Sequence, residues 1–410
     1  MSIKLLGKEL KLTAKSLTYW LVIGVIFGFI MTQIGMSLRV IQEPKPGEDG
    51  SYGMIRTENK ELIQQQAYRA LFLEYQAESY QAYPFGFYKE VKLDSKEEQT
   101  IRTILEKAAG KTIEELAADY TAQIEAAAQS NPGEAVMENS SYTFPLVKGH
   151  AFSQFEEDMQ EVSGFIGKGS AYEKNSYMND AEEPMTYEQA RKQYRKIVEK
   201  DKVTGAYARM VCDYLGIILA IVPVFLAATV ALRDRRAKAA PIIYSRLVAS
   251  IRLVGCRYSS TVLLLLIPVL LISLMPAVQS LVIADKLNAT GSLLLFYQYI
   301  IGWTLPTILF VTGLGFLMTE LFGGITAIAV QIIFWFFALF SSTDTLNGSV
   351  GWKLIPRFNT VGLPEVFEQI VQELIWNRLF YAGLGIIFLG VTILVFDYKR
   401  KGGRILGKSI

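Results

Sequence analysis

The sequence predicts a mainly α, polytopic membrane protein with six transmembrane helices, an N-terminal interfacial helix and a mostly helical extracytoplasmic domain, either α or α+β. Three observations support this fold class. Hydrophobic residues make up 51% of the 410 residues and the mean hydropathy is positive, which excludes an ordinary soluble domain. Most of them lie in runs of about 18 or more, long enough for a helix to cross a hydrocarbon core of roughly 30 Å. Lys and Arg gather beside these runs, as expected of cytoplasmic span ends.

The apolar runs predict the six spans. Their predicted bounds are 17–38, 207–232, 259–283, 292–318, 321–340 and 378–396. The first run is too long for the core of a cleaved signal peptide and no small-x-small site follows Leu38, so we expect it to remain as an anchor. Only the sequence TELFGG separates the fourth run from the fifth, and its Glu320 and glycine pair predict a tight turn there.

The residues before the first span, 1–16, carry charged and apolar side chains at helical spacing. Lys4, Lys8, Lys11 and Lys15 share one face, with the apolar residues roughly opposite. This pattern predicts a cytoplasmic amphipathic helix in the membrane interface. The alternative is a short basic tail that only follows the positive-inside rule.

Basic residues near the span ends orient the chain. They cluster in residues 1–16, the loop 233–258 and the tail 397–410, which an even number of spans places together on the cytoplasmic face. The segments 39–206 and 341–377 are then extracytoplasmic. Residues 39–206 hold 20 Lys and Arg against 29 Asp and Glu, whereas the rest of the chain holds 21 against 10. We therefore expect an acidic outer domain and a basic membrane part.

Helix start signals run through the segment 39–206. Ser95, Thr112 and Thr186 each stand three residues before a Glu or Gln, which is the spacing of a capping box. The segment has no cysteine, which fits a bacterial plasma membrane with a Gram-positive-type envelope better than a eukaryotic secretory route. Beyond the fifth span, residues 364–376 place apolar and polar side chains on opposite helical faces and predict a second amphipathic helix.

Motifs for catalysis or cofactor binding are missing from the sequence. The one histidine is His150, and no His or Cys stands at metal-ligand spacing from it. No G-x-x-x-x-G-K-[ST] loop is present, so this chain does not hold ATP by a P-loop. We therefore expect no enzymatic activity, no resident cofactor or metal, and no nucleic-acid partner.

The predicted spans contain prolines and glutamines rather than acids at mid-membrane depth. A proline frees backbone carbonyls and kinks a helix, which either serves the structure or marks a mobile transport pathway. Both interpretations stay open. The candidate pathway or kink residues are Pro223, Pro268, Pro276, Gln279, Gln298, Pro306 and Gln331.

The loop 233–258 reads RDRRAKAAPIIYSRLVASIRLVGCRY and combines seven Lys and Arg residues with one acid. Its proline can begin a helix, and Ile242, Ile243, Leu247 and Ile251 would form an apolar stripe about two turns long. Such a helix can lie on lipid headgroups or fit a groove on a soluble protein. A loop that only sets topology is the alternative. The candidate contact residues are Arg235, Arg236, Ile242, Ile243, Tyr244, Arg246 and Leu247.

This layout and two of its motifs resemble the permease subunit of ABC-2 type exporters, in the branch with a large extracytoplasmic domain between the first two spans. The loop is similar to that family's loop in its acid-and-base start, its I-Y-S-R and the Arg-Tyr pair that re-enters the membrane. The ending WNRLFYAGLGIIFLGVTILVFDYKRK is similar to the family's final span. Lys238, Ala239 and Leu247 stand where that loop often has Gly-Thr and a proline.

The resemblance implies that the loop is a coupling helix, and that a separate cytoplasmic ATPase carries ATP and Mg. It also implies a second permease subunit, identical or paralogous, among membrane lipids. The other class of function is a membrane-anchored sensor or scaffold, or a mechanotransmission protein, whose outer domain binds a ligand or a cell-envelope partner. Six spans with kinking prolines exceed what a sensor needs and therefore favour transport.

Overall fold

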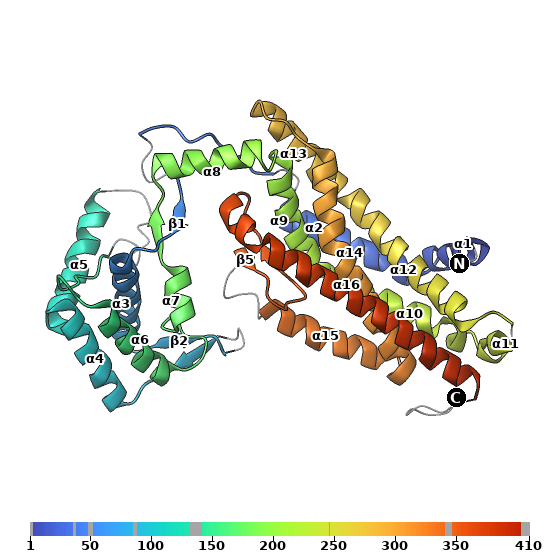
Figure 1. Ribbon diagram of the computed structural model, residues 1–410. Coiled ribbons are helices and arrows are strands. Elements are labelled where there is room, and N and C mark those ends of the chain that lie inside the picture. Colours follow the sequence, from blue (N-terminus) through green and yellow to red (C-terminus); the bar gives the residue numbers. More distant parts are fainter. Residues whose placement is uncertain are drawn as a thin grey trace. The chain divides into compact units, whose positions relative to one another are not determined.

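The computed structural model describes residues 3–35, 38–47, 52–84, 88–130, 142–245, 247–340 and 347–402 (Figure 1). The chain divides into two compact units. We call Pro44–Ala190 the inserted unit, and Met1–Glu43 together with Arg191–Ile410 the helical unit. The outer domain predicted over 39–206 thus corresponds to a compact unit that is shorter at both ends. Along the chain, α8 (Tyr187–Glu199) leads from the inserted unit into the helical unit.

The inserted unit is mostly helical, with two small antiparallel sheets. Its helices before α8 are α3 (Lys60–Gln76), α4 (Ser95–Ala109), α5 (Ile113–Ser130), α6 (Phe152–Ile166) and α7 (Lys174–Asp180). Its strand pairs are β1 (Met54–Arg56) with β4 (Glu182–Pro184), and β2 (Tyr80–Ala82) with β3 (Lys89–Val91). The β1–β4 pairing joins the two ends of the unit, which suits an insertion between two helices. Tyr68, Leu105 and Phe155 are among the side chains of its core.

Two of the three predicted capping boxes are present, and the third is shifted by one residue. Thr112 precedes α5 and Thr186 precedes α8. In each case the threonine hydroxyl accepts from the backbone N–H of the residue three positions later, and the side chain of that residue accepts from the backbone N–H of the threonine. Before α4 the cap is Asp94, which pairs in this way with Glu97, and not Ser95. A carboxylate also interacts favourably with the helix dipole, which a serine hydroxyl does not.

The helical unit consists mostly of long apolar helices. Its first five helices in chain order are α1 (Ile3–Ala14), α2 (Leu17–Ile34), α9 (Thr204–Leu219), α10 (Pro223–Arg236) and the short α11 (Ala240–Tyr244). They are followed by α12 (Ser250–Ile272), α13 (Leu274–Lys286), α14 (Leu293–Phe322), α15 (Gly324–Phe340) and α16 (Pro364–Arg400). A small hairpin of β5 (Asn347–Ser349) and β6 (Arg357–Phe358) precedes α16.

Four helical stretches of the described residues are long and apolar enough to cross a membrane: α2, α12 continued by α13, α14 and α16. The pair α9 and α10, bent by 43°, supplies a fifth when it is counted as one span. The mainly α architecture of a membrane protein is therefore confirmed. The fifth predicted span, 321–340, corresponds to α15, which has 17 residues and is shorter than the other candidate spans. The predicted turn before it is present, with Gly323 at a φ of +100°.

The loop predicted over 233–258 is shorter in the structure, because α10 and α12 both extend into it. Only residues 237–249 connect the two helices. Arg233 and Arg257 lie within helices because each pairs with the buried carboxylate of Glu9, so their charges do not force the chain into a loop. The 26 residues predicted to lie between the second and third spans, as a loop or helix, are thus helical at both ends with a connection in the middle.

The amphipathic helix predicted over 364–376 and the span predicted over 378–396 form one continuous helix, α16. The polar residue at the junction, Asn377, does not end the helix, because its side chain donates to the carbonyls of Gly351 and Lys353. With 37 residues α16 is about 55 Å long. Its amphipathic first turns therefore extend beyond a hydrocarbon core of roughly 30 Å.

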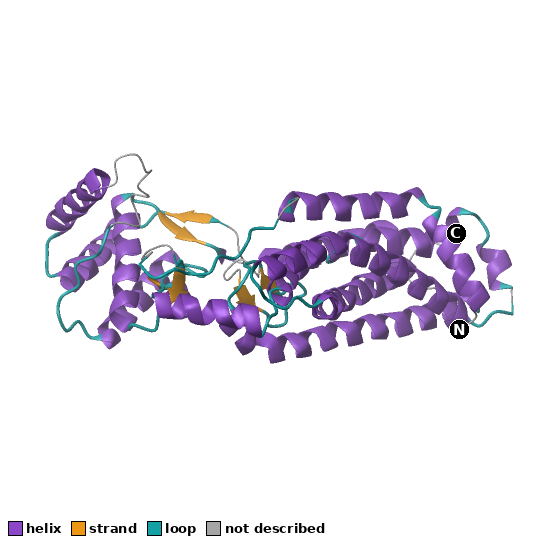
Figure 2. Cartoon of the chain, turned by 90° about the horizontal axis from the view of Figure 1, so that it is seen from above, coloured by secondary structure: helices purple, strands orange, loops and turns teal. Residues whose placement is uncertain are grey.

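The helices of the helical unit run side by side (Figure 2), and α14 packs against α9, α10, α12, α15 and α16. Glycines bring α14 and α16 together. A methyl group on Gly313 would lie 2.7 Å from the carbonyl oxygen of Gly385, and one on Gly385 would lie 2.6 Å from the backbone of Leu309. A larger residue at either Gly313 or Gly385 would therefore clash with the backbone of the other helix.

One end of the helical unit gathers three segments that are far apart in the sequence. α1, α11 and the C-terminal end of α16 lie there (Figures 1 and 2). These are the segments for which the sequence predicts a common cytoplasmic face, and we call this end the basic end. Of the predicted tail 397–410, residues 403–410 lie outside the described residues, as do residues 341–346 of the predicted outer segment.

Candidate functional site

The connecting segment 237–249 is the part of the basic end that the sequence singles out for coupling. Within it α11 has only five residues. The predicted apolar stripe of two turns is therefore wrong, since Leu247 follows the helix and Ile251 belongs to α12. A contact with Arg400 explains why α11 ends after five residues. The Nε of Arg400 donates over 2.9 Å to the carbonyl of Tyr244, which a continuing helix would use for its own next turn.

The side chains of this segment divide into an anchored set and an exposed set. Tyr244 is half-buried, and its ring packs edge-on against Phe396 of α16, with 5.5 Å between the ring centroids. Ile243 is also half-buried. Ile242, by contrast, is 61% exposed, and Leu247 is fully exposed. With Val248, which is also exposed, the segment thus presents three large apolar side chains to its surroundings from a backbone that is fixed to α16.

α1 is fastened to the same end by a buried acid that the sequence analysis did not single out. The carboxylate of Glu9 is 4% exposed and accepts from Arg233 of α10 and, over 3.4 Å, from Arg257 of α12. Arg257 also pairs with Asp234, with 2.5 Å between the charged atoms. Two features of the sequence could have indicated this cluster. Glu9 is an acid in a lysine-rich segment, and Asp234 is an acid that stands among three arginines.

A second cluster joins α10 to the ends of α14 and α16. Arg235 donates over 2.6 Å to the carboxylate of Glu320, and the ammonium of Lys399 lies 3.6 Å from the same carboxylate oxygen. The neighbouring Arg236 is exposed and has no such partner among the described residues. Arg246 lies outside the described residues.

Together these contacts connect the exposed segment to the helices behind it. Ser250, the first residue of α12, donates over 2.7 Å to Asp397 of α16, so that both ends of the segment meet α16. The helices α1, α10, α12, α14 and α16 are all linked by charged side chains at this end. A force on the segment would therefore act on these helices together and not on one loop.

At the opposite end of the helical unit, two buried ion pairs fix the bent helix α9. The carboxylate of Asp213 accepts from Arg357 over 2.8 Å and from a backbone N–H of β6. Arg209 is completely buried, donates over 2.8 Å to Asp201, and lies 4.4 Å from the ring centre of Phe367. Buried pairs of this kind specify an arrangement because either charge alone would be costly.

Exposed ion pairs connect α8 to the start of α16. Lys196 lies 3.0 Å from Glu365 and 3.1 Å from Glu368, and Lys200 lies 2.6 Å from Glu368. Pairing with Glu365 raises the pKa of Lys196. These side chains are solvated, so the pairs contribute less than the buried ones and weaken with salt.

The predicted pathway residues lie on five helices, α10 and α12 to α15. Pro223 begins α10 directly after the 43° bend, whereas Pro268 and Pro306 lie inside continuous helices and Pro276 lies in the first turn of α13. Gln298 is exposed. None of the seven predicted residues lines either of the two described cavities.

Two of the glutamines have structural partners. Gln331 of α15 is buried, and its Nε2 donates over 2.6 Å to the carbonyl of Ala220, which lies in the break between α9 and α10. Gln279 accepts from the N–H of Leu38 over 3.2 Å. Gln331 thus satisfies a carbonyl that the break leaves without a helical donor.

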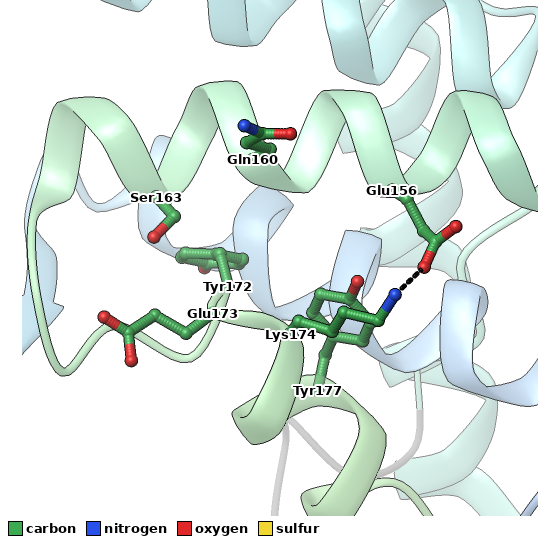
Figure 3. A pocket seen from close by; sticks show the side chains of 7 residues that line it. All are labelled: Glu156, Gln160, Ser163, Tyr172, Glu173, Lys174 and Tyr177. Atoms are coloured by element: carbon green, nitrogen blue, oxygen red, sulfur yellow. Dashed lines mark hydrogen bonds and ion pairs between the residues drawn. The ribbon is translucent and has the colours of Figure 1, made fainter.

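The inserted unit contains an open cavity of about 460 Å³ with a polar lining (Figure 3). An ion pair of Lys174 with Glu156, 2.6 Å long, stands at one side, and Ser163 lies at the other. The buried Tyr172 forms part of the wall and donates to Glu74 over 2.6 Å. Burial raises the pKa of Glu74, and the bond from Tyr172 opposes this effect. The lining suits a small polar ligand but has no catalytic pair.

Within the described residues, no group of three His, Cys, Asp or Glu side chains converges on a position that could hold a metal ion. His150 instead contacts Gln64 over 3.1 Å and stands edge-on to the ring of Tyr68. No family model, no curated protein and no solved structure matches the chain.

Proposed function

We propose that this chain is the transmembrane permease subunit of an ATP-driven exporter of the ABC-2 type, in a bacterial plasma membrane. It crosses the membrane six times, with α15 as the fifth span and α16 as the sixth, and both termini are cytoplasmic. The inserted unit faces the outside of a Gram-positive-type envelope. A second permease subunit, identical or paralogous, completes the pathway, and separate cytoplasmic ATPase subunits hold ATP and Mg.

The observation that carries this proposal is the contrast within residues 237–249. Ile242 and Leu247 are exposed, while the backbone beside them is held by Arg400 and by the ring of Tyr244. A loop that only sets topology needs positive charge but no fixed backbone. Exposed apolar side chains on a rigid base are instead typical of a docking surface for another protein.

The charged clusters supply a route from that surface to the helices. Glu9, Arg235 and Glu320 connect the segment's flanking helices with α1, α14 and α16. A movement of the ATPase can shift the permease between two states only if the ATPase binds one state more tightly. The interface at Ile242 and Leu247 is where that difference would arise.

Purification of the tagged full-length chain from membranes of its own host tests the proposal. We expect a P-loop ATPase to co-purify, and ATP hydrolysis to depend on it and on Mg, since this chain has no P-loop. Mass spectrometry identifies the companion, and a phosphate-release assay measures hydrolysis. Hydrolysis by the chain alone, or a complex that contains no ATPase, would overturn the proposal.

Cysteine labelling tests the topology. Cys212 and Cys256 are completely buried, so an impermeant maleimide should leave them unmodified in the folded protein. We expect Lys96→Cys, in the inserted unit, to react in intact cells. Ala249→Cys, in the connecting segment, should react only after permeabilisation. The opposite pattern would contradict the proposed orientation.

The polar cavity of the inserted unit favours a second candidate function, a membrane sensor whose outer domain binds a ligand. Its volume of about 460 Å³ lies within the ~300–1,000 Å³ typical of small-molecule sites. A sensor would use the same connecting segment to contact a signalling protein. The co-purification experiment separates the two functions, because a sensor has no need of an ATPase.

A further inference from the structure

The helical unit has a groove on its surface that the proposed coupling role does not use. Its volume is about 340 Å³, and it lies between the start of α2, one face of α10 and the start of α15. The lining residues are Thr18, Phe225, Ala228, Thr229, Leu232, Arg236, Gly324, Ile325 and Ile328. Apart from the arginine and two threonines the lining is apolar, and the hydroxyl of Thr229 is turned back to the carbonyl of Phe225, 2.8 Å away.

The α10 side of the groove is a single stripe with an arginine at one end. Phe225, Thr229, Leu232 and Arg236 recur at three- or four-residue spacing on one helical face. From the first to the last the helix rises about 16 Å. That length is half of a hydrocarbon core of roughly 30 Å, which is the depth of one leaflet.

Arg236 differs from the other arginines in the last turn of α10. Arg233 pairs with Glu9 and Arg235 pairs with Glu320, so both charges are neutralised inside the protein. The side chain of Arg236 is exposed at the mouth of the groove and forms no ion pair or hydrogen bond with a described residue. A cation is thus available where the groove reaches the basic end.

We propose that this groove binds one anionic phospholipid of the cytoplasmic leaflet. An acyl chain lies along Phe225, Leu232 and Ile328, and the phosphate of the headgroup meets Arg236. Apolar contact along one leaflet's depth, ending in a free cation at the membrane surface, matches the two parts of such a lipid. The proposal concerns the lipid environment and does not depend on the exporter function.

A second copy of this chain is the other occupant to consider. An inserted helix would have to place an acid against Arg236, and it would bury an apolar face along α10 and α15. The described exposed faces of α2 and α15 are apolar and carry no acid within their helices. The unpaired arginine therefore favours the lipid.

The test uses the full-length chain, purified in an uncharged detergent, with lipid binding measured by native mass spectrometry. Phosphatidylglycerol should bind more tightly than a diacylglycerol with the same acyl chains. Arg236→Gln should weaken phosphatidylglycerol binding about fivefold, while leaving diacylglycerol binding unchanged. Thr229→Trp, which fills the groove without changing the charge, should weaken both. The matched control Arg252→Gln removes an exposed charge of the first turn of α12, outside the groove, and should alter neither.

Three outcomes would overturn the proposal. Equal phosphatidylglycerol binding by the wild type and Arg236→Gln would exclude the headgroup contact. Complete displacement of the lipid by inorganic phosphate alone would show a simple anion site with no acyl-chain contact. A loss of dimers in Thr229→Trp, with lipid binding unchanged, would assign the groove to a second copy of the chain.

Discussion

Replacement of Asp213 by Ala is expected to cause the largest loss of stability of any single change considered for this chain. The carboxylate is completely buried and accepts hydrogen bonds from Arg357, over 2.8 and 3.3 Å, and from the N–H of Phe358. Its removal leaves a buried guanidinium without a counter-ion, which costs about 3–5 kcal/mol. Fluorimetry of the detergent-purified protein should show a fall in apparent Tm of roughly 10 °C.

Two further variants make this prediction specific. Asp213→Ala combined with Arg357→Leu should recover part of the lost stability, because the second change removes the unpaired charge. Glu368→Gln breaks an exposed pair with Lys200 and should have a much smaller effect. If Glu368→Gln destabilises as much as Asp213→Ala, burial is not what makes the Asp213 pair important.

The long apolar elements of the fold could be predicted because their signal is local. Each predicted span corresponds to one helix or to two consecutive helices, and the turn at Gly323 was located from the six residues TELFGG. The predicted boundaries of elements were wrong where a contact with a residue far away in the sequence determines whether a helix continues. α16 continues through Asn377 because the side-chain amide donates to the carbonyls of Gly351 and Lys353, 26 and 24 positions away.

The basic end was predicted as a set of residues but not as a network. Arg235, Ile242, Tyr244 and Leu247 were singled out from one stretch of sequence. The partners that give them a fixed geometry come from elsewhere in the chain. Arg400 is 156 positions from Tyr244, and the ion pairs of Glu9 span 224 and 248 positions. Spacing rules describe neighbours on one helix and do not reach such pairs.

The prolines carried a local signal that left two interpretations open, a structural kink and a mobile pathway. Pro268 and Pro306 lie inside helices that continue past them, whereas Pro276 follows the interruption between α12 and α13 and Pro223 follows the 43° bend. Gln331, predicted with them as a pathway residue, donates to the carbonyl of Ala220 at that bend. The structure therefore accounts for this pair as a satisfied break in a helix, and the pathway interpretation remains a prediction.

The second large effect concerns the connecting segment and rests on the proposed function. If Ile242 and Leu247 dock on an ATPase, Leu247→Asp should reduce the affinity of the complex at least about 100-fold, since burying an unpaired charge costs a few kcal/mol. Ile242→Asp should act in the same direction. Both side chains are exposed in this chain, so neither change should unfold it. Co-purification of the ATPase and its hydrolysis rate measure the effect.

The conservative variant Leu247→Met is the matched control, because it keeps an apolar side chain of similar volume and should preserve the complex. The anchored neighbour gives a different expectation. Arg400→Gln removes the Nε donor to Tyr244 and should loosen the segment without placing a charge in the interface. It should therefore lower hydrolysis more than it lowers ATPase binding. The proposal would be contradicted if both Leu247→Asp and Ile242→Asp, at wild-type membrane levels, showed normal ATPase binding and hydrolysis. Residues 237–249 would then serve only to set the topology.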